Sequence, residues 1–83
     1  MRVNVRLAEP FWRVVGQRDL ELEIKDHARV SDLLDLLEGK FPALAQEMAR
    51  AQPYIFIDEQ EAAHETNLQD GARVHIVWPV AGG

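Results

Sequence analysis

The chain has 83 residues and a mass of 9.4 kDa, which is enough for one domain and too little for two. Its 9 basic and 14 acidic side chains give a net charge of −5, which argues against binding to nucleic acid or to an anionic membrane. The absence of cysteine excludes disulfide bonds, a thiol nucleophile and cysteine-ligated metals, including the cluster of a ferredoxin. We expect a cytoplasmic protein, because no apolar stretch is long enough for a signal peptide or a membrane span.

Two segments near the start of the chain alternate between apolar and polar residues, which is the period of a half-buried β-strand. They span residues 2–8 and 19–25, and the short connection between them favours an antiparallel hairpin. The connecting residues after Pro10 fit either one helical turn or a wide loop that ends at Gly16. The positions expected to face the core are Val3, Val5, Leu7, Leu20, Leu22 and Ile24.

After residue 29 the apolar period lengthens to that of an α-helix with one buried stripe. The stripe, at positions i, i+3, i+4 and i+7, consists of Val30, Leu33, Leu34 and Leu37. Asp32 in the first turn suits the helix dipole, and Ser31 beside it is expected to cap or begin the helix. Gly39 is expected to end this helix, and Pro42 to open a second, shorter one over residues 43–51.

The second half of the chain predicts two further strands and the turns around them. Residues 54–57 form a continuous apolar run, which is typical of a strand covered on both faces. Residues 58–61 have the composition of a turn, after which a short pairing around Ala62 and Ala63 fits the sequence. A second turn ends at Gly71, which is able to adopt a positive φ. The last strand, over residues 72–78, places Val74, Ile76 and Trp78 on one face.

This order of hairpin, helix, strand, turn and strand predicts an α+β fold of the β-grasp type. We expect a single domain over residues 1–83, with a mixed sheet of four to five strands, one main helix on one face and a second short helix. The last strand is expected to lie beside the first, in parallel. Pro79 is expected to end that strand, and residues 79–83 to form a flexible tail.

The usual catalytic and metal-binding patterns are weak in this sequence. We expect no metal site and no bound cofactor, because the histidines at 27, 64 and 75 form no i, i+4 pair. The acidic residues at 58, 59, 61 and 65 lack the spacing of a calcium loop, and a solvated edge is the better interpretation. Ser31 lies in no nucleophile elbow, and no glycine-rich phosphate loop is present. Phe11 and Trp12 are expected to cover the end of the core rather than to stack on a ligand.

The end of the chain carries the strongest functional signal. Gly82 and Gly83 have no Cβ atom and are able to enter a channel that excludes any other residue. They follow a strand and a proline, which makes them the tip of an arm on a rigid body. A free carboxylate is unreactive, but its adenylate is a good acyl donor, and a glycyl group leaves the carbonyl unhindered. Taken alone, the two glycines are equally compatible with a frayed end.

Residues 68–83 resemble the MoaD/ThiS family of prokaryotic ubiquitin-like sulfur carriers, through Asp70-Gly71, the alternating strand and the ending Pro79-Val80-Ala81-Gly82-Gly83. The likeness is greatest to the members that form the small subunit of molybdopterin synthase. It implies a carrier in molybdenum cofactor biosynthesis that has no catalytic set of its own. In the family an E1-like enzyme (MoeB/ThiF-like) uses ATP to adenylate the terminal glycine, here Gly83, which then becomes a thiocarboxylate. The resemblance implies that residues 79–83 enter a large pterin-converting subunit (MoaE-like) and deliver the sulfur there.

Side-chain alternation also indicates where such partners dock. If the isoleucines of residues 54–57 pack under the helix, the aromatic residues of that strand point away from it, beside the polar face of the last strand. The predicted docking surface therefore consists of Tyr54, Phe56, His75 and Val77. A register shift of one residue would bury the aromatic residues instead. The net negative charge predicts partners with basic entrances.

Three alternatives stay open. A sulfur carrier of this kind is also able to serve thiamine, cysteine, tRNA thiolation or a tungsten cofactor, although the segment 43–51 makes the chain longer than we expect for the thiamine carrier. In a second alternative the chain is a ubiquitin-like modifier, and Gly83 ends in an isopeptide bond to a target lysine. In a third it is an interaction domain whose tail is inert.

Overall fold

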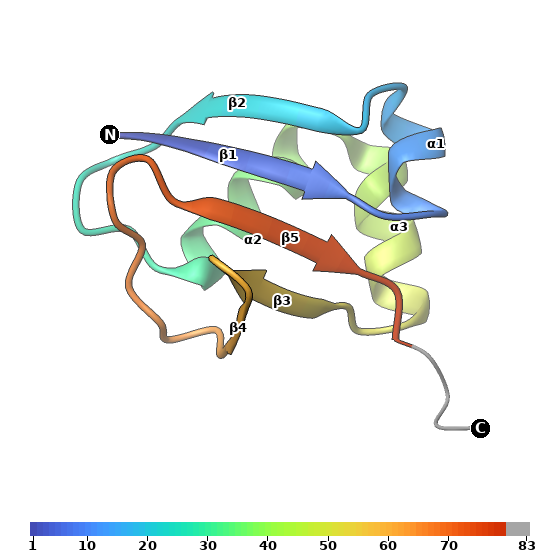
Figure 1. The fold of residues 1–83 in the computed structure, drawn as a ribbon. Helices are drawn as coiled ribbons and strands as arrows, with labels where there is room; N and C mark the ends of the chain where they lie inside the picture. The colour runs from blue at the N-terminus through green and yellow to red at the C-terminus, as the bar shows by residue number, and fades with distance from the viewer. Residues whose placement is uncertain (80–83) are drawn as a thin grey trace.

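The computed structural model describes residues 1–79, and Figure 1 shows their arrangement. Among these residues, no helix combines the length and the apolar character needed to cross a bilayer. In chain order the elements are β1 (Arg2–Leu7), α1 (Phe11–Val15), β2 (Asp19–Glu23), α2 (Val30–Lys40), α3 (Pro42–Arg50), β3 (Tyr54–Ile57), β4 (Gln60–Ala62) and β5 (Arg73–Val77).

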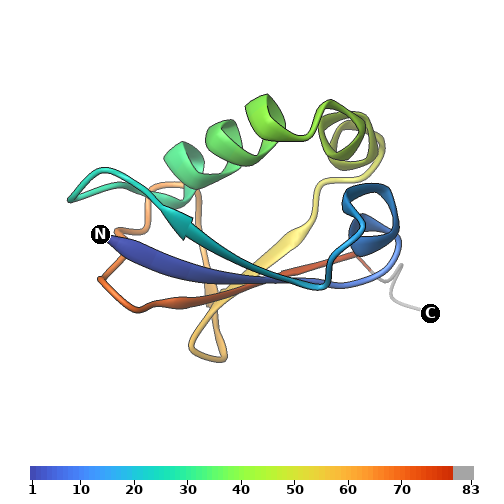
Figure 2. The same cartoon turned by 90° about the horizontal axis from the view of Figure 1, so that it is seen from above.

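The strands form one five-stranded mixed sheet in the order β2-β1-β5-β3-β4. β1 and β5 run parallel, with Leu7 opposite Ile76, and the other neighbouring strands are antiparallel. α2 and α3 lie on one side of the sheet (Figure 2). We call the opposite side the outer face. The arrangement is the predicted β-grasp, including the parallel pairing of the first and last strands.

The core lies between the sheet and α2, and the residues that alternation placed inward build it. β1 is exposed and buried at alternate positions along its whole length. α2 buries its predicted stripe, and α3 adds Leu44 and Met48. Among residues 1–79, every fully buried side chain is apolar. The largest are Phe11, Leu7, Leu33, Leu37, Leu44 and Ile76.

The start of α2 is stabilised by a carboxylate and by the chain that precedes β5. The Asp32 carboxylate accepts a hydrogen bond from the backbone N–H of Arg29 at 2.8 Å. This bond, helped by Lys25 at 3.5 Å, holds the pKa of Asp32 below its usual value. Ser31 lies in the first turn, as predicted, and its backbone N–H donates to the carbonyl oxygen of His64 at 3.0 Å.

The prediction that Gly39 ends α2 is wrong. The helix continues past it, and Phe41 takes a non-helical conformation with φ −130° and ψ 85°, while its N–H still donates to the Leu37 carbonyl oxygen at 2.8 Å. The cause is Pro42, because a proline ring disfavours helical geometry in the residue before it. Pro42 then begins α3, as predicted.

The predicted turn over residues 58–61 is shorter than expected. Only Asp58 and Glu59 form it, with positive φ of 48° and 73°, and the next two residues already belong to β4. A two-residue turn with both φ angles positive matches the twist of the strands that it joins. The expected pairing at Ala62 is confirmed, whereas Ala63 lies beyond β4.

The segment after Pro10 is helical rather than a loop. α1 makes little more than one turn and ends at Gly16, which has φ 91° and whose N–H donates to the Trp12 carbonyl oxygen. Positive φ carries no steric penalty for glycine. Of the two alternatives left open for this segment, the helical turn is therefore the correct one, and it adds a third helix to the two expected in the described part of the chain.

The buried stripe of α2 generates a stability prediction. Replacing Leu33 by alanine should lower the free energy of unfolding by about 2–5 kcal/mol, because it removes packed methyl groups and leaves a cavity. Leu36→Ala on the half-buried side of the same helix is the matched control and should have a much smaller effect. Urea denaturation followed by circular dichroism measures both. Equal losses would contradict the assigned helix face.

The bond at the start of α2 generates a pH prediction. The folded pKa of Asp32 lies below its usual value of 3.8, so the carboxylate contributes stability above that pH and loses it as the pH falls through the folded pKa. Asp32→Ala should therefore lower the melting temperature at neutral pH, and the deficit should shrink at strongly acidic pH. Asp35→Ala in the same helix serves as the control. A deficit that is the same at both pH values would contradict the assignment.

Candidate functional site

The four residues predicted to form a docking surface lie together on the outer face. Tyr54 stands directly opposite Val77, and Phe56 directly opposite His75, on the neighbouring strands β3 and β5. Tyr54 is 46% exposed, His75 is exposed, and the other two are half-buried. We call Tyr54, Phe56, His75 and Val77 the outer patch. Its place in the fold is the predicted one, and its role in docking stays a prediction.

The burial of the intervening residues fixes this register. Ile55 of β3 and Val74 and Ile76 of β5 are buried in the core. Because successive side chains point to opposite faces of a strand, their neighbours must lie on the outer face. A shift of one residue would exchange the two sets and bury the aromatic side chains. Ile57 is only half-buried, since it lies close to the β3–β4 turn.

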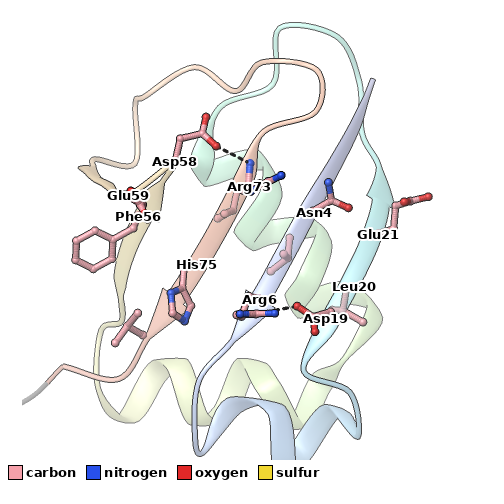
Figure 3. A pocket seen from close by; sticks show the side chains of 13 residues that line it. Asn4, Arg6, Asp19, Leu20, Glu21, Phe56, Asp58, Glu59, Arg73 and His75 are labelled. Atoms are coloured by element: carbon pink, nitrogen blue, oxygen red, sulfur yellow. Dashed lines mark hydrogen bonds and ion pairs between the residues drawn. The ribbon is translucent and has the colours of Figure 1, made fainter.

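A shallow depression extends from the outer patch across the sheet (Figure 3). Phe56, His75 and Arg6 form one row over three neighbouring strands. Arg6 donates through Nε to Oδ1 of Asp19 at 2.9 Å, and this hydrogen bond together with the negative charge raises the pKa of Arg6. The depression therefore combines the apolar side chains of Phe56 and Val77 with charged side chains on the strands and at the β3–β4 turn. A mixture of this kind is typical of transient protein interfaces.

The sequence analysis did not single out the arginines of this depression, and it interpreted Asp58 and Glu59 only as part of a solvated acidic edge. Arg6, Arg73 and Asp58 all line it, and the Asp58 carboxylate accepts a hydrogen bond from the backbone N–H of Arg73 at 3.3 Å. Alternation along the first strand already placed Arg6 on the polar side. Only the pairing of β1 with β5 brings it beside His75, and that pairing was predicted without a register.

The outer patch lies at the end of the sheet that leads into the last residues of the chain. The Ala8 N–H donates to the carbonyl oxygen of Ile76 at 3.0 Å. The hydrogen bonds between β1 and β5 therefore continue to the carboxyl ends of both strands. Trp78 then packs on Phe11, with ring centroids 5.6 Å apart, and Pro79 is half-buried. The chain is thus anchored up to the last described residue. The predicted tail residues Val80, Ala81, Gly82 and Gly83 lie outside the described residues.

The two aromatic residues of α1 have different surroundings. Phe11 is fully buried, which confirms that it covers this end of the core. Trp12 is half-buried, and the guanidinium carbons of Arg13 and Arg18 lie 5.0 and 4.7 Å from its ring centre. Guanidinium groups at this distance attract the ring electrostatically. These contacts help to hold Trp12 in place on α1.

The histidines lie in separate parts of the fold. His27 precedes α2, His64 follows β4, and His75 belongs to the outer patch. In the described part of the chain, no three histidine or carboxylate side chains come close enough to hold a metal ion.

Comparison with known proteins identifies relatives over the whole length of the chain. A family model described as the ThiS family matches residues 5–83. Small archaeal modifier protein 3 of Haloferax volcanii is 32% identical over 92 aligned residues, which cover all of both chains.

Solved structures share the fold at lower identity. A putative molybdopterin converting factor, subunit 1, from Pyrococcus furiosus has a TM-score of 0.86 at 22% identity, covering 96% of this chain and 99% of that one. A chain from the protein–protein complex of subunits 1 and 2 of the molybdopterin-converting factor from Helicobacter pylori has a TM-score of 0.71 at 21% identity, with both chains fully covered. At these identities the likeness shows a shared β-grasp.

Proposed function

This chain belongs to the ThiS family, and on that premise we propose that it is a sulfur carrier whose terminal Gly83 is adenylated and then converted to a thiocarboxylate. The family comprises ubiquitin-like sulfur carriers and modifiers. The observation that carries the proposal is the ending Pro79-Val80-Ala81-Gly82-Gly83, which follows the anchored end of β5 and lies inside the matched region.

The proposed loading takes place in the cytoplasm on an E1-like adenylating enzyme (MoeB/ThiF-like) that uses ATP. A carboxylate oxygen of Gly83 attacks the α-phosphorus, and pyrophosphate leaves. A sulfur nucleophile then attacks the acyl carbon, and AMP leaves, so that sulfur replaces one oxygen. The chain contributes an unhindered glycyl carbon, because glycine has no side chain to obstruct the attack. The sulfur is carried by the main chain, which agrees with a sequence without cysteine.

We infer that the loaded sulfur goes to a pterin precursor in molybdenum cofactor biosynthesis, with this chain as the small subunit of molybdopterin synthase. The large partner would be a pterin-converting subunit (MoaE-like). Two observations are consistent with this choice. The fold matches a protein described as a molybdopterin converting factor and a chain of a two-subunit complex of that name. The helix α3 is the extra element that a thiamine carrier is expected to lack.

The outer patch is the surface that we propose both partners contact. Ordering residues 79–83 in a partner channel opposes binding by roughly 1–2 kcal/mol per residue fixed, so contacts elsewhere must compensate. Tyr54 and Val77 lie at the end of the sheet from which the chain continues toward Gly83. A partner that holds the last residues therefore has this apolar surface within reach.

A second function has one observation in its favour. The relative that is 32% identical over the full length of both chains is a small archaeal modifier protein. In that role Gly83 would be joined to a target lysine by an isopeptide bond. Higher-mass conjugates that disappear when Gly82 and Gly83 are deleted would favour this function over the carrier.

The carrier proposal predicts a mass change on the intact chain. After co-production with its activating enzyme, ATP and a sulfur donor, mass spectrometry should show one oxygen exchanged for sulfur at Gly83. Gly83→Ala should impair this exchange while leaving the melting temperature unchanged, because β5 is anchored upstream of the last residues. Absence of the exchange, or an equal loss of exchange and of stability, would contradict the proposal.

The outer patch predicts a separation of binding from folding. Phe56→Ala should weaken binding to the activating enzyme or to the large subunit by at least about fivefold, since truncation of a central aromatic contact has effects of this size. Val14→Ala on α1, where Val14 is 38% exposed, is the matched control and should leave binding unchanged. Isothermal titration calorimetry measures both. Equal weakening by the two variants would rule the outer patch out as the contact surface.

A further inference from the structure

β2 forms one edge of the sheet, and its outward backbone groups are open. The Leu7 N–H donates to the Arg18 carbonyl oxygen at 2.8 Å, and the Ile24 N–H donates to the Met1 carbonyl oxygen at 2.9 Å. In an antiparallel pair, every second residue of a strand bonds to the neighbouring strand through its N–H and C=O. The even-numbered residues of β2 therefore direct these backbone groups toward β1. The odd-numbered residues direct N–H and C=O away from the sheet, and none of these groups is paired within residues 1–79. They belong to Asp19, Glu21 and Glu23.

The same three residues place carboxylates along this open edge. All three are exposed and stand two positions apart on the outer face. Arg2 lies 3.5 Å from Glu21 and 3.2 Å from Glu23, and Arg6 lies 2.9 Å from Asp19. Two arginines thus form ion pairs with three carboxylates, which leaves one negative charge in excess. Exposed ion pairs of this kind are weak, so an incoming cation is able to share these carboxylates.

The inward side chains of β2 provide the apolar half of the edge. Leu20 is 8% exposed and Leu22 is 9% exposed, whereas Val3 and Val5 on the neighbouring strand are at most 1% exposed. The margin of the core therefore lies at β2. A strand added here would place every second side chain beside these leucines and bury the rest of their surface.

We propose that the β2 edge binds an extended segment of a partner protein in which basic and apolar residues alternate. The partner strand pairs with the open N–H and C=O groups of Asp19, Glu21 and Glu23. Its basic side chains stand opposite the carboxylates, at the spacing of roughly 4.5–5.5 Å between Cβ atoms that directly opposed residues have. Its apolar side chains extend the core beside Leu20 and Leu22. A second copy of β2 is disfavoured at this edge, because it would oppose carboxylate to carboxylate.

The backbone pattern supplies a direct test. A short peptide of alternating lysine and valine, blocked at both ends, is added to the full chain, and amide hydrogen exchange is followed by NMR. The amides of Asp19, Glu21 and Glu23 should become protected, whereas those of Leu20 and Leu22 are already bonded to β1. A peptide of alternating glutamate and valine is the control and should protect none of them. Protection by both peptides, or by neither, would overturn the proposal.

Two variants separate backbone pairing from charge. Glu21→Pro removes one outward N–H, which an edge strand tolerates, and should abolish protection of its neighbours. Glu21→Lys should weaken binding of the lysine–valine peptide by about tenfold, because it places a lysine opposite the basic side chains of the peptide. Glu65→Lys makes the same change in net charge on an exposed loop residue and should leave binding unchanged. Equal weakening by the two lysine variants would show attraction to the net charge alone and would overturn the proposal.

This inference does not depend on sulfur chemistry. The measurements use neither the activating enzyme nor Gly83, so they give the same result on a chain that lacks the last two residues. Failure of thiocarboxylate formation would leave the β2 edge untouched, and failure of peptide binding would leave the carrier function untouched.

Discussion

The parallel pairing of β1 with β5 determines where every other part of the molecule lies. Two parallel strands cannot be joined by a tight turn, so the chain between them must cross the sheet, and here the crossing carries α2 and the buried stripe. The register of the pair sets Val5 against Val74 in the core and Arg6 against His75 on the outer face. It also makes the last strand an interior one. The residues beyond it therefore continue from a part of the sheet that is held on both sides.

The division of the sheet into two faces explains why so small a domain is able to present apolar surface. The helices cover one face, and the whole apolar core is built there. A single exposed tyrosine would be ordinary in any protein. Four neighbouring residues with aromatic and aliphatic character on the other face, beside the base of the tail segment, are a different case. They add nothing to the core, which is why we propose them as the surface that a partner contacts.

The sequence predicted the strands and the helix whose pattern of apolar residues follows from burial. It missed the features that depend on local backbone geometry, such as the end of α2 and the turn before β4. Alternation in β1 and β5 and the stripe of α2 follow from the need to hide apolar groups, and they fixed the fold and the outer patch. Gly39 was misread because glycine is only permissive, whereas Pro42 restricts its neighbour outright. The turn at Asp58 and Glu59 uses positive φ without glycine, which composition does not reveal. The open edge of β2 requires knowledge of which amides face β1, and no single-strand pattern contains it.

The net charge of the chain is a poor guide to its individual surfaces. A charge of −5 suggests basic partners at every surface, but three of the four residues of the outer patch are Tyr54, Phe56 and Val77, and the neighbouring Arg6 is paired with Asp19. The carboxylates of β2 lie two strands away from β5, at the opposite side of β1. A partner at the outer patch and a partner at the β2 edge would therefore not compete for the same backbone or apolar groups. The two surfaces meet in the depression, because Asp19, Leu20 and Glu21 of β2 line it together with three residues of the outer patch. Arg6 stands between them, where it pairs with Asp19 and lies beside His75. Because that ion pair is exposed, the coupling that it would provide between the two proposed surfaces is weak.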